Sequence, residues 1–184
     1  RTTDNFSVGR WLPGMISDRN VSRGTFSGSS WTPAINASYP GVLMGFLCPT
    51  ADNVTIDFNV VFNSVTAADR WGGIAVACPD DRPYNDGAPW HFNCYHILFR
   101  QDGRLQIYPV TAGTGTGAAT TQTGTALTLG ASYHMRVTIN ATNVTMTNVT
   151  NSQTATLAST SARGGYFHFG NAGASVSISG VAVS

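Results

Sequence analysis

The sequence contains no lysine and no glutamate: all ten basic residues are arginine and all nine acidic residues are aspartate. Lysine and glutamate are among the commonest helix formers, whereas aspartate is a poor one. Threonine, valine, serine, glycine and asparagine are abundant instead, and these residues favour strands and turns. A chain of this composition has little from which to build helices, so we expect an all-β protein.

Charge of either sign is also scarce, because charged residues make up 10% of the chain and the formal net charge is +1. A usual charged fraction is about 25%. This composition indicates no basic stripe for nucleic acid, so we expect no nucleic-acid partner. No run approaches the ~20 apolar residues that span a membrane, and we expect no membrane span. A surface of hydroxyls and amides instead favours neutral polar ligands such as sugars.

Cysteines are few, three in all, and they lack the paired spacing of a structural zinc site. Cys78 and Cys94 bracket a fifteen-residue loop, whereas Cys48 stands apart. Two alternatives remain open at this point. One is a disulfide between Cys78 and Cys94 in a protein matured outside the cell, and the other is three buried thiols.

Apolar residues alternate with polar ones along much of the chain, which is typical of half-buried strands. The Asp102-Gly103 dipeptide predicts a two-residue hairpin turn. The low-complexity segment 111–126 predicts an exposed loop or a weak edge strand. The predicted strands cover residues 42–48, 54–60, 71–78, 95–101, 104–110, 133–139, 143–149, 154–157, 166–169 and 176–183.

Strands at hairpin spacing predict a two-sheet antiparallel β-sandwich of the jelly-roll type. The 184 residues suit one such domain, and no internal repeat or boundary divides them. The chain starts at Arg1 rather than Met, and we expect it to be a piece of a longer protein.

Four segments occur in an order that is similar to a known family. They are a strand from Val54, a Gly-Gly-apolar strand up to Cys78, a hairpin ending in Leu-x-Ile, and Gly-x-x-Tyr-x-x-Arg-Val before the closing strand. This order resembles the concanavalin A-like, laminin-G-like jelly rolls. Such domains occur as carbohydrate-binding modules of secreted bacterial enzymes. They also occur as receptor-binding domains of bacteriophage tail proteins, including phages of actinobacteria.

The loop 79–93 is the first candidate site. Carboxylate and amide oxygens there are of the kind that Ca²⁺ prefers. We expect either no cofactor or calcium, with Asp80, Asp81 and Asp86 as the calcium ligands. Its aromatic faces suit sugar rings, which stack on them. The alternative is a loop whose residues only pack on the sandwich. The candidate ligand-binding residues of this loop are Asp80, Asp81, Arg82, Tyr84, Asn85, Asp86, Trp90 and His91.

The second candidate site is the outward face of a sheet. If alternate residues of the strands point inward, the residues between them point outward and form one polar surface when the strands are neighbours. A solvated sheet face without a ligand explains the same pattern equally well. The candidate residues are His96, Arg100, Tyr108, His134, Arg136 and His168.

Relatives on this fold that hydrolyse glycosides carry a Glu-x-Asp-x-x-Glu strand, and this chain has no glutamate. We therefore predict a non-catalytic domain that binds cell-envelope glycans at an extracellular or virion surface, as the receptor-binding part of a phage tail protein. The alternatives are a carbohydrate-binding module of a secreted enzyme, a glycan hydrolase or lyase that uses Asp and His, and a structural domain that forms a homo-oligomer within a fibre.

Overall fold

The computed structural model describes most of the chain from Asn53 onward and separate short segments before it. The first five strands, Thr114 and Tyr166 are described by their backbone only. The described residues are 2–4, 15–17, 24–27, 30–33, 41–47, 53–79, 93–112, 114–115, 117–158, 162 and 166–184.

Every regular element of these residues is a strand, as the composition predicts. Across the same residues, no helix has the length and apolar character needed to cross a membrane. The strands are β1 (Thr2–Asp4), β2 (Met15–Ser17), β3 (Gly24–Ser27), β4 (Ser30–Pro33), β5 (Gly41–Leu47), β6 (Val54–Val65), β7 (Trp71–Cys78), β8 (Cys94–Arg100), β9 (Leu105–Thr111), β10 (Thr114–Gly115), β11 (Thr120–Gln122), β12 (Ser132–Ile139), β13 (Asn143–Asn148), β14 (Gln153–Ala158), β15 (Tyr166–Ala172) and β16 (Ala174–Val183).

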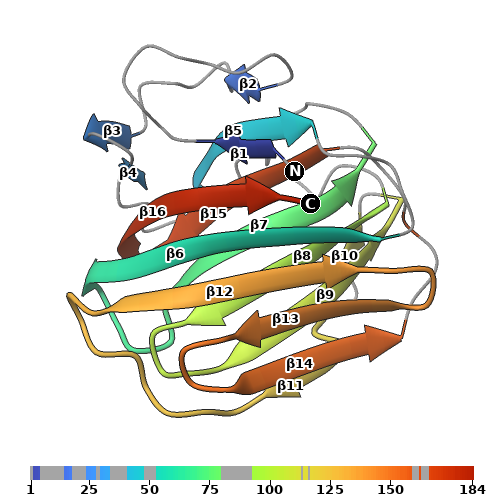
Figure 1. Cartoon of the computed structure of the whole chain (residues 1–184). Helices are drawn as coiled ribbons and strands as arrows, with labels where there is room; N and C mark the ends of the chain where they lie inside the picture. Colours follow the sequence, from blue (N-terminus) through green and yellow to red (C-terminus); the bar gives the residue numbers. More distant parts are fainter. Residues whose placement is uncertain are drawn as a thin grey trace.

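The strands form two antiparallel sheets, which Figure 1 shows as the two layers of a sandwich. Sheet A has the order β14-β13-β12-β6-β16-β4-β3, and β1 also pairs with β16. Sheet B has the order β10-β9-β8-β7-β15-β5-β2, and β11 also pairs with β9. The two-sheet antiparallel sandwich predicted from the sequence is therefore confirmed.

One hydrophobic core fills the space between the sheets. In β6 every second residue from Val54 to Phe62 is buried, and β12 alternates in the same way, as the period of two predicts. Aromatic rings join the layers: Phe58 of sheet A lies 5.0 Å from Phe169 and 5.7 Å from Phe99 of sheet B, between ring centroids.

The outer faces of the two sheets differ. Sheet A presents half-exposed polar residues on its outer side, so its strands alternate between buried and accessible positions. In sheet B all eight residues of β7 and the first six of β8 are buried on both sides. The near-continuous apolar and small-residue sequence of β7, WGGIAVAC, is typical of a strand that is buried on both faces.

A β-bulge in β7 changes the side to which Cys78 points. The sequence alternation predicts that Cys78 faces the core with Val76 and that Ala77 faces outward. Instead Ala77 has a positive φ of 57° and lies in the core, and Cys78 clusters with Ala75 on the outer side. A bulge inserts one extra residue, so every later side chain changes faces.

The same bulge brings two cysteines to the outer face of sheet B. Cys78 and Cys94 are both buried there, in one small cluster with Ala75 and Val110. Cys94 is a free thiol, so the structure contains no bond between it and Cys78. Of the two alternatives, the buried thiol is the one found at Cys94, whereas Cys48 lies outside the described residues.

The hairpin between β8 and β9 forms where the sequence predicts it, but its loop is longer than two residues. The backbone N–H of Gly103 donates to the carbonyl of Arg100, and the N–H of Arg100 donates to the carbonyl of Arg104. Gly103 takes a positive φ of 89°. This is a three-residue loop, a turn followed by a left-handed glycine. The segment 111–126 contributes the short edge strands β10 and β11, which confirms the weak edge strand.

Candidate functional site

The eight candidate residues of the first site, from Asp80 to His91, lie outside the described residues. Their role as sugar or calcium ligands stays a prediction. Within the described part of the chain, no group of three His, Cys, Asp or Glu side chains lies close enough to hold a metal ion. The geometry that follows therefore belongs to the second candidate site, on the sheets.

Strand register brings four residues into one row across the outer face of sheet B. Tyr108 of β9 is the partner of His96 of β8, His96 is the partner of Ala75 of β7, and Ala75 is the partner of His168 of β15. These strands are neighbours, so the prediction that His96, Tyr108 and His168 share one face is confirmed. Adjacent strands lie ~4.8 Å apart, which brings His96 within contact distance of Tyr108.

The two histidines of this row are buried, which corrects their expected exposure. His96 is 0% exposed and His168 is 2% exposed, although both point away from the core. Alternation along a strand decides which side a residue faces, but it does not decide whether that side is covered. Burial also lowers the pKa of His96 well below its ordinary value, and the charge of Arg100 lowers it further.

Two other candidates do not belong to this surface. His134 and Arg136 lie on β12 of sheet A and point outward on the opposite side of the sandwich. The single polar surface predicted from the sequence is therefore two surfaces. The expectation was wrong because spacing along the chain says nothing about which sheet a strand joins.

On the outer face of sheet A, one carboxylate receives both of these side chains. Oδ1 of Asp57 accepts a hydrogen bond from Nε of Arg136 at 2.8 Å and lies 2.7 Å from Nε2 of His134. Asp57 is the register partner of Arg136 on the neighbouring strand β6. Asp57 and Arg136 thus form an opposite-charge pair across the strands, and His134 contacts the same carboxylate.

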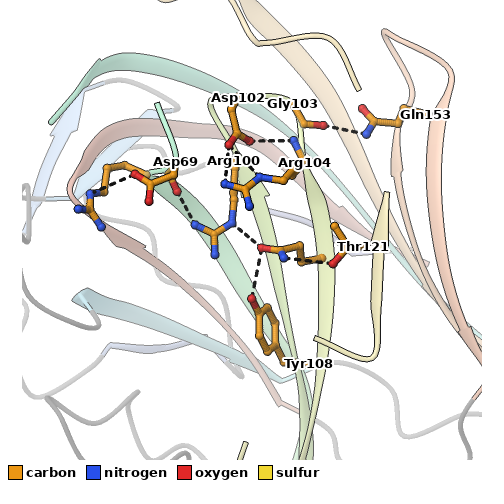
Figure 2. A network of polar contacts seen from close by, with 10 residues as sticks. Asp69, Arg100, Asp102, Gly103, Arg104, Tyr108, Thr121 and Gln153 are labelled. Atoms are coloured by element: carbon orange, nitrogen blue, oxygen red, sulfur yellow. Dashed lines mark hydrogen bonds and ion pairs between the residues drawn. The ribbon is translucent and has the colours of Figure 1, made fainter. Parts of the chain in front are cut away.

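On the outer face of sheet B at β8 and β9, a network of hydrogen bonds fixes the remaining candidates, Arg100 and Tyr108, and Figure 2 shows it. Oε1 of Gln106 accepts hydrogen bonds from Nε of Arg100 and from the hydroxyl of Tyr108, the latter at 3.2 Å. Nε2 of Gln106 donates to Oγ1 of Thr121 at 3.1 Å. Arg100 also donates from Nη1 to the backbone carbonyl of Asp69. Arg100 and Tyr108 are half-buried, so both remain accessible to a ligand.

An aromatic residue that sequence reasoning did not select adjoins this network. Trp71 is the register partner of Arg100, and its ring centroid lies 5.3 Å from that of His96. A Cβ at Gly73 would lie 3.1 Å from the Trp71 ring, so the glycine lets the ring approach the sheet. Trp71 packs with Leu98 and Tyr108. The same alternation that places Gly73 and Ala75 on the outer face also places Trp71 there, so this pattern could have identified Trp71 from the sequence.

No protein-family model matches the sequence, and no curated protein sequence is similar enough to count as a match. Solved structures do match the fold. The exoplasmic/lumenal domain of VIP36, in a Ca²⁺/Man-bound form, has a TM-score of 0.70 at 10% identity, over 98% of this chain and 87% of that one.

Two further structures are similar along nearly their whole length. The carbohydrate-binding module CBM66 from Bacillus subtilis has a TM-score of 0.65 at 10% identity, over 93% of this chain and 95% of that one. The carbohydrate recognition domain of Emp47p has a TM-score of 0.65 at 14% identity, over 98% of this chain and 93% of that one. With its two antiparallel sheets, the chain therefore has the concanavalin A-like jelly-roll fold that its sequence resembles.

Proposed function

We propose that this domain binds glycans and does not catalyse a reaction. The observation that carries the proposal is the outer face of sheet B at β8 and β9, where Tyr108 and Arg100 are both accessible and both held by Gln106. Sugar rings present apolar C–H patches that pack on aromatic faces, and their hydroxyls need donors and acceptors in fixed positions. A surface that combines an aromatic ring with preset polar groups meets both requirements.

The fold supports this proposal. Three similar structures are a lumenal domain solved with Ca²⁺ and Man, a carbohydrate-binding module and a carbohydrate recognition domain. One fold serves many functions, so the ligand class follows from the residues of the site.

The non-catalytic part of the proposal rests on the carboxylates. Glycoside hydrolysis needs two of them, one acting as an acid with a raised pKa. Three aspartates have described side chains, and each is paired with an arginine: Asp57, Asp69 and Asp102. Burial raises the pKa of Asp102, but hydrogen bonds from Arg104 outweigh it, so the pKa lies below its ordinary value. Asp102 is therefore not suited to donate a proton at the start of a hydrolysis step.

Two finer statements belong to the same proposal. The ligand is a glycan of a cell envelope, and the domain is the receptor-binding part of a phage tail protein, at an extracellular or virion surface. The loop 79–93 adds contacts through its aspartates and aromatic residues, with Ca²⁺ held by Asp80, Asp81 and Asp86. The sequence resemblance to phage tail domains supports the first statement, and the residue types of the loop support the second.

A glycan array and whole-cell binding assay tests the proposal, with and without a calcium chelator. Saturable binding without product release is expected, and its loss on chelation would implicate the loop. Tyr108→Ala should weaken binding about tenfold, because it removes the aromatic face and one hydrogen bond of Gln106. Thr147→Ala, on the outer face of sheet A, is the matched control and should bind as the wild type does.

The alternatives give different results in the same experiment. A carbohydrate-binding module of a secreted enzyme would bind an isolated polysaccharide but no bacterial surface. A structural fibre domain would bind no glycan and would form an oligomer in solution. Release of a product from any glycan would contradict the non-catalytic assignment.

A further inference from the structure

Arg100 carries a positive charge that neutral groups hold in place. Its Nε donates to the amide oxygen of Gln106, and its Nη1 donates to the backbone carbonyl of Asp69. No carboxylate among the described side chains lies within ion-pair distance of this guanidinium. The planar guanidinium group of Arg100 is therefore fixed in orientation, but its charge has no direct counter-ion among the described side chains.

The neighbouring carboxylates pair with other arginines. Asp69 pairs with Arg70 at 3.6 Å, and Asp102 pairs with Arg104 at 2.6 Å. Among the described side chains of this group, three arginines therefore face two aspartates, which leaves one positive charge in excess. Figure 2 shows how the backbone carbonyl of Asp69, and not its carboxylate, receives Arg100.

The donors that remain on Arg100 suit an acidic group. A guanidinium has five N–H donors, and two are used in the bonds described above, which leaves three for a ligand. Arginine binds carboxylate and phosphate oxygens through pairs of charge-assisted hydrogen bonds. Because the side chain is already immobilised, binding such a group costs little additional conformational entropy.

We propose that the glycan bound on the outer face of sheet B at β8 and β9 carries an acidic group, a carboxylate or a phosphate ester, that pairs with Arg100. This inference rests on the proposed glycan-binding function and narrows its ligand class. Tyr108, two positions along the same face from Gln106, supplies the surface for the sugar ring that bears the acid.

The experiment uses matched pairs of immobilised glycans. One arm compares a uronic-acid glycan with its carboxyl-reduced form, and the other compares a glycerol-phosphate glycan with its dephosphorylated form. We expect at least tenfold weaker binding to the neutral member of one pair, equivalent to about 1.4 kcal/mol. The arm that shows the loss identifies the source of the acid. Equal binding to both members of both pairs would overturn the inference and leave glycan binding intact, whereas no binding to any glycan would refute both proposals.

Variants assign the preference to its residue. Arg100→Met should abolish the preference for the acidic member. Arg100→Lys should retain part of it, because lysine keeps the positive charge but lacks the planar, paired N–H donors of arginine. Arg136→Met, which removes a half-exposed arginine from the opposite sheet, should leave the preference unchanged. An unaltered preference in Arg100→Met would contradict the assignment.

A measurement on the wild type does not depend on how the variants fold. Raising the NaCl concentration from about 0.05 to about 0.5 M should weaken binding to the acidic glycan severalfold, because salt screens an accessible ion pair. Binding that is insensitive to salt would also overturn the inference.

Discussion

Burial keeps His96 neutral in the folded protein. Its side chain lies wholly buried beside the rings of Trp71 and Tyr108, with centroid distances of 5.3 and 6.0 Å. Burial disfavours the charged imidazolium, and the nearby charge of Arg100 adds to the effect, so the pKa of His96 lies well below 6.5. In the unfolded chain the same imidazole takes up a proton near pH 6.5.

This difference makes stability depend on pH. Because the folded pKa is depressed, the unfolded state binds more protons below pH 6.5, and the contribution of His96 is complete only above that pH. We expect the free energy of unfolding to fall as pH decreases from 6.5, by up to about 1.4 kcal/mol per pH unit from this residue. Denaturant unfolding of the wild type and of His96→Gln at a series of pH values measures this pH dependence of the free energy of unfolding. The variant should show a shallower slope over this range, and equal slopes in the two proteins would contradict the account.

At the scale of the element, Gln153 at the start of β14 links the edges of the two sheets. Its Nε2 donates to the carbonyl of Gly103 at 2.8 Å and to the carbonyl of Gln122 at 3.0 Å, both in or next to strands of sheet B. Figure 2 shows the bond to Gly103, and Figure 1 shows β11 lying beside β14. Pairing an edge with side-chain bonds also protects it from pairing with another chain.

Replacing this residue should loosen that edge. Gln153→Ala removes both hydrogen bonds, so we expect the free energy of unfolding to fall by about 1–2 kcal/mol. Gln122→Ala is the matched control, since among the described residues the Gln122 side chain donates only to the neighbouring carbonyl of Thr123, and it is exposed. Its effect should stay within about 0.5 kcal/mol. Chemical denaturation of both variants measures these changes. Equal losses in the free energy of unfolding would show that Gln153 does not link the sheets.

At the scale of the molecule, one core connects both sheets. Its buried residues come from β6, β12, β13, β14 and β16 of sheet A, from β7, β8, β9 and β15 of sheet B, and from Leu127 and Ala162 outside the strands. Neither sheet can separate without exposing the shared face, so the sandwich should open as a unit. The domain assignment of residues 1–184 stays a prediction, and this core is the physical basis for it.

A shared core predicts a single cooperative unfolding transition. Far-ultraviolet circular dichroism reports the strands, and tryptophan fluorescence reports the packing of residues such as Trp71. We expect the two signals to change at the same denaturant concentration. Separate midpoints would indicate that part of the chain folds independently and would contradict a single domain.

The sequence by itself determined the fold class and most of the strands. The absence of lysine and glutamate disfavoured helices, and the alternation along 54–60 and 133–139 gave both the strands and their buried faces. These are local properties, because side-chain direction repeats every two residues whatever the strand later pairs with. For the same reason the sequence correctly grouped His96, Tyr108 and His168 on one face.

Only the tertiary structure decided how those faces are used. It assigned His134 and Arg136 to the opposite sheet and buried His96, and it turned Cys78 outward through the bulge at Ala77. Sheet membership, coverage of a face and the position of a bulge depend on contacts between segments far apart in the chain. Hydrophobic periodicity contains no information about such contacts, since it describes one strand and not its neighbours.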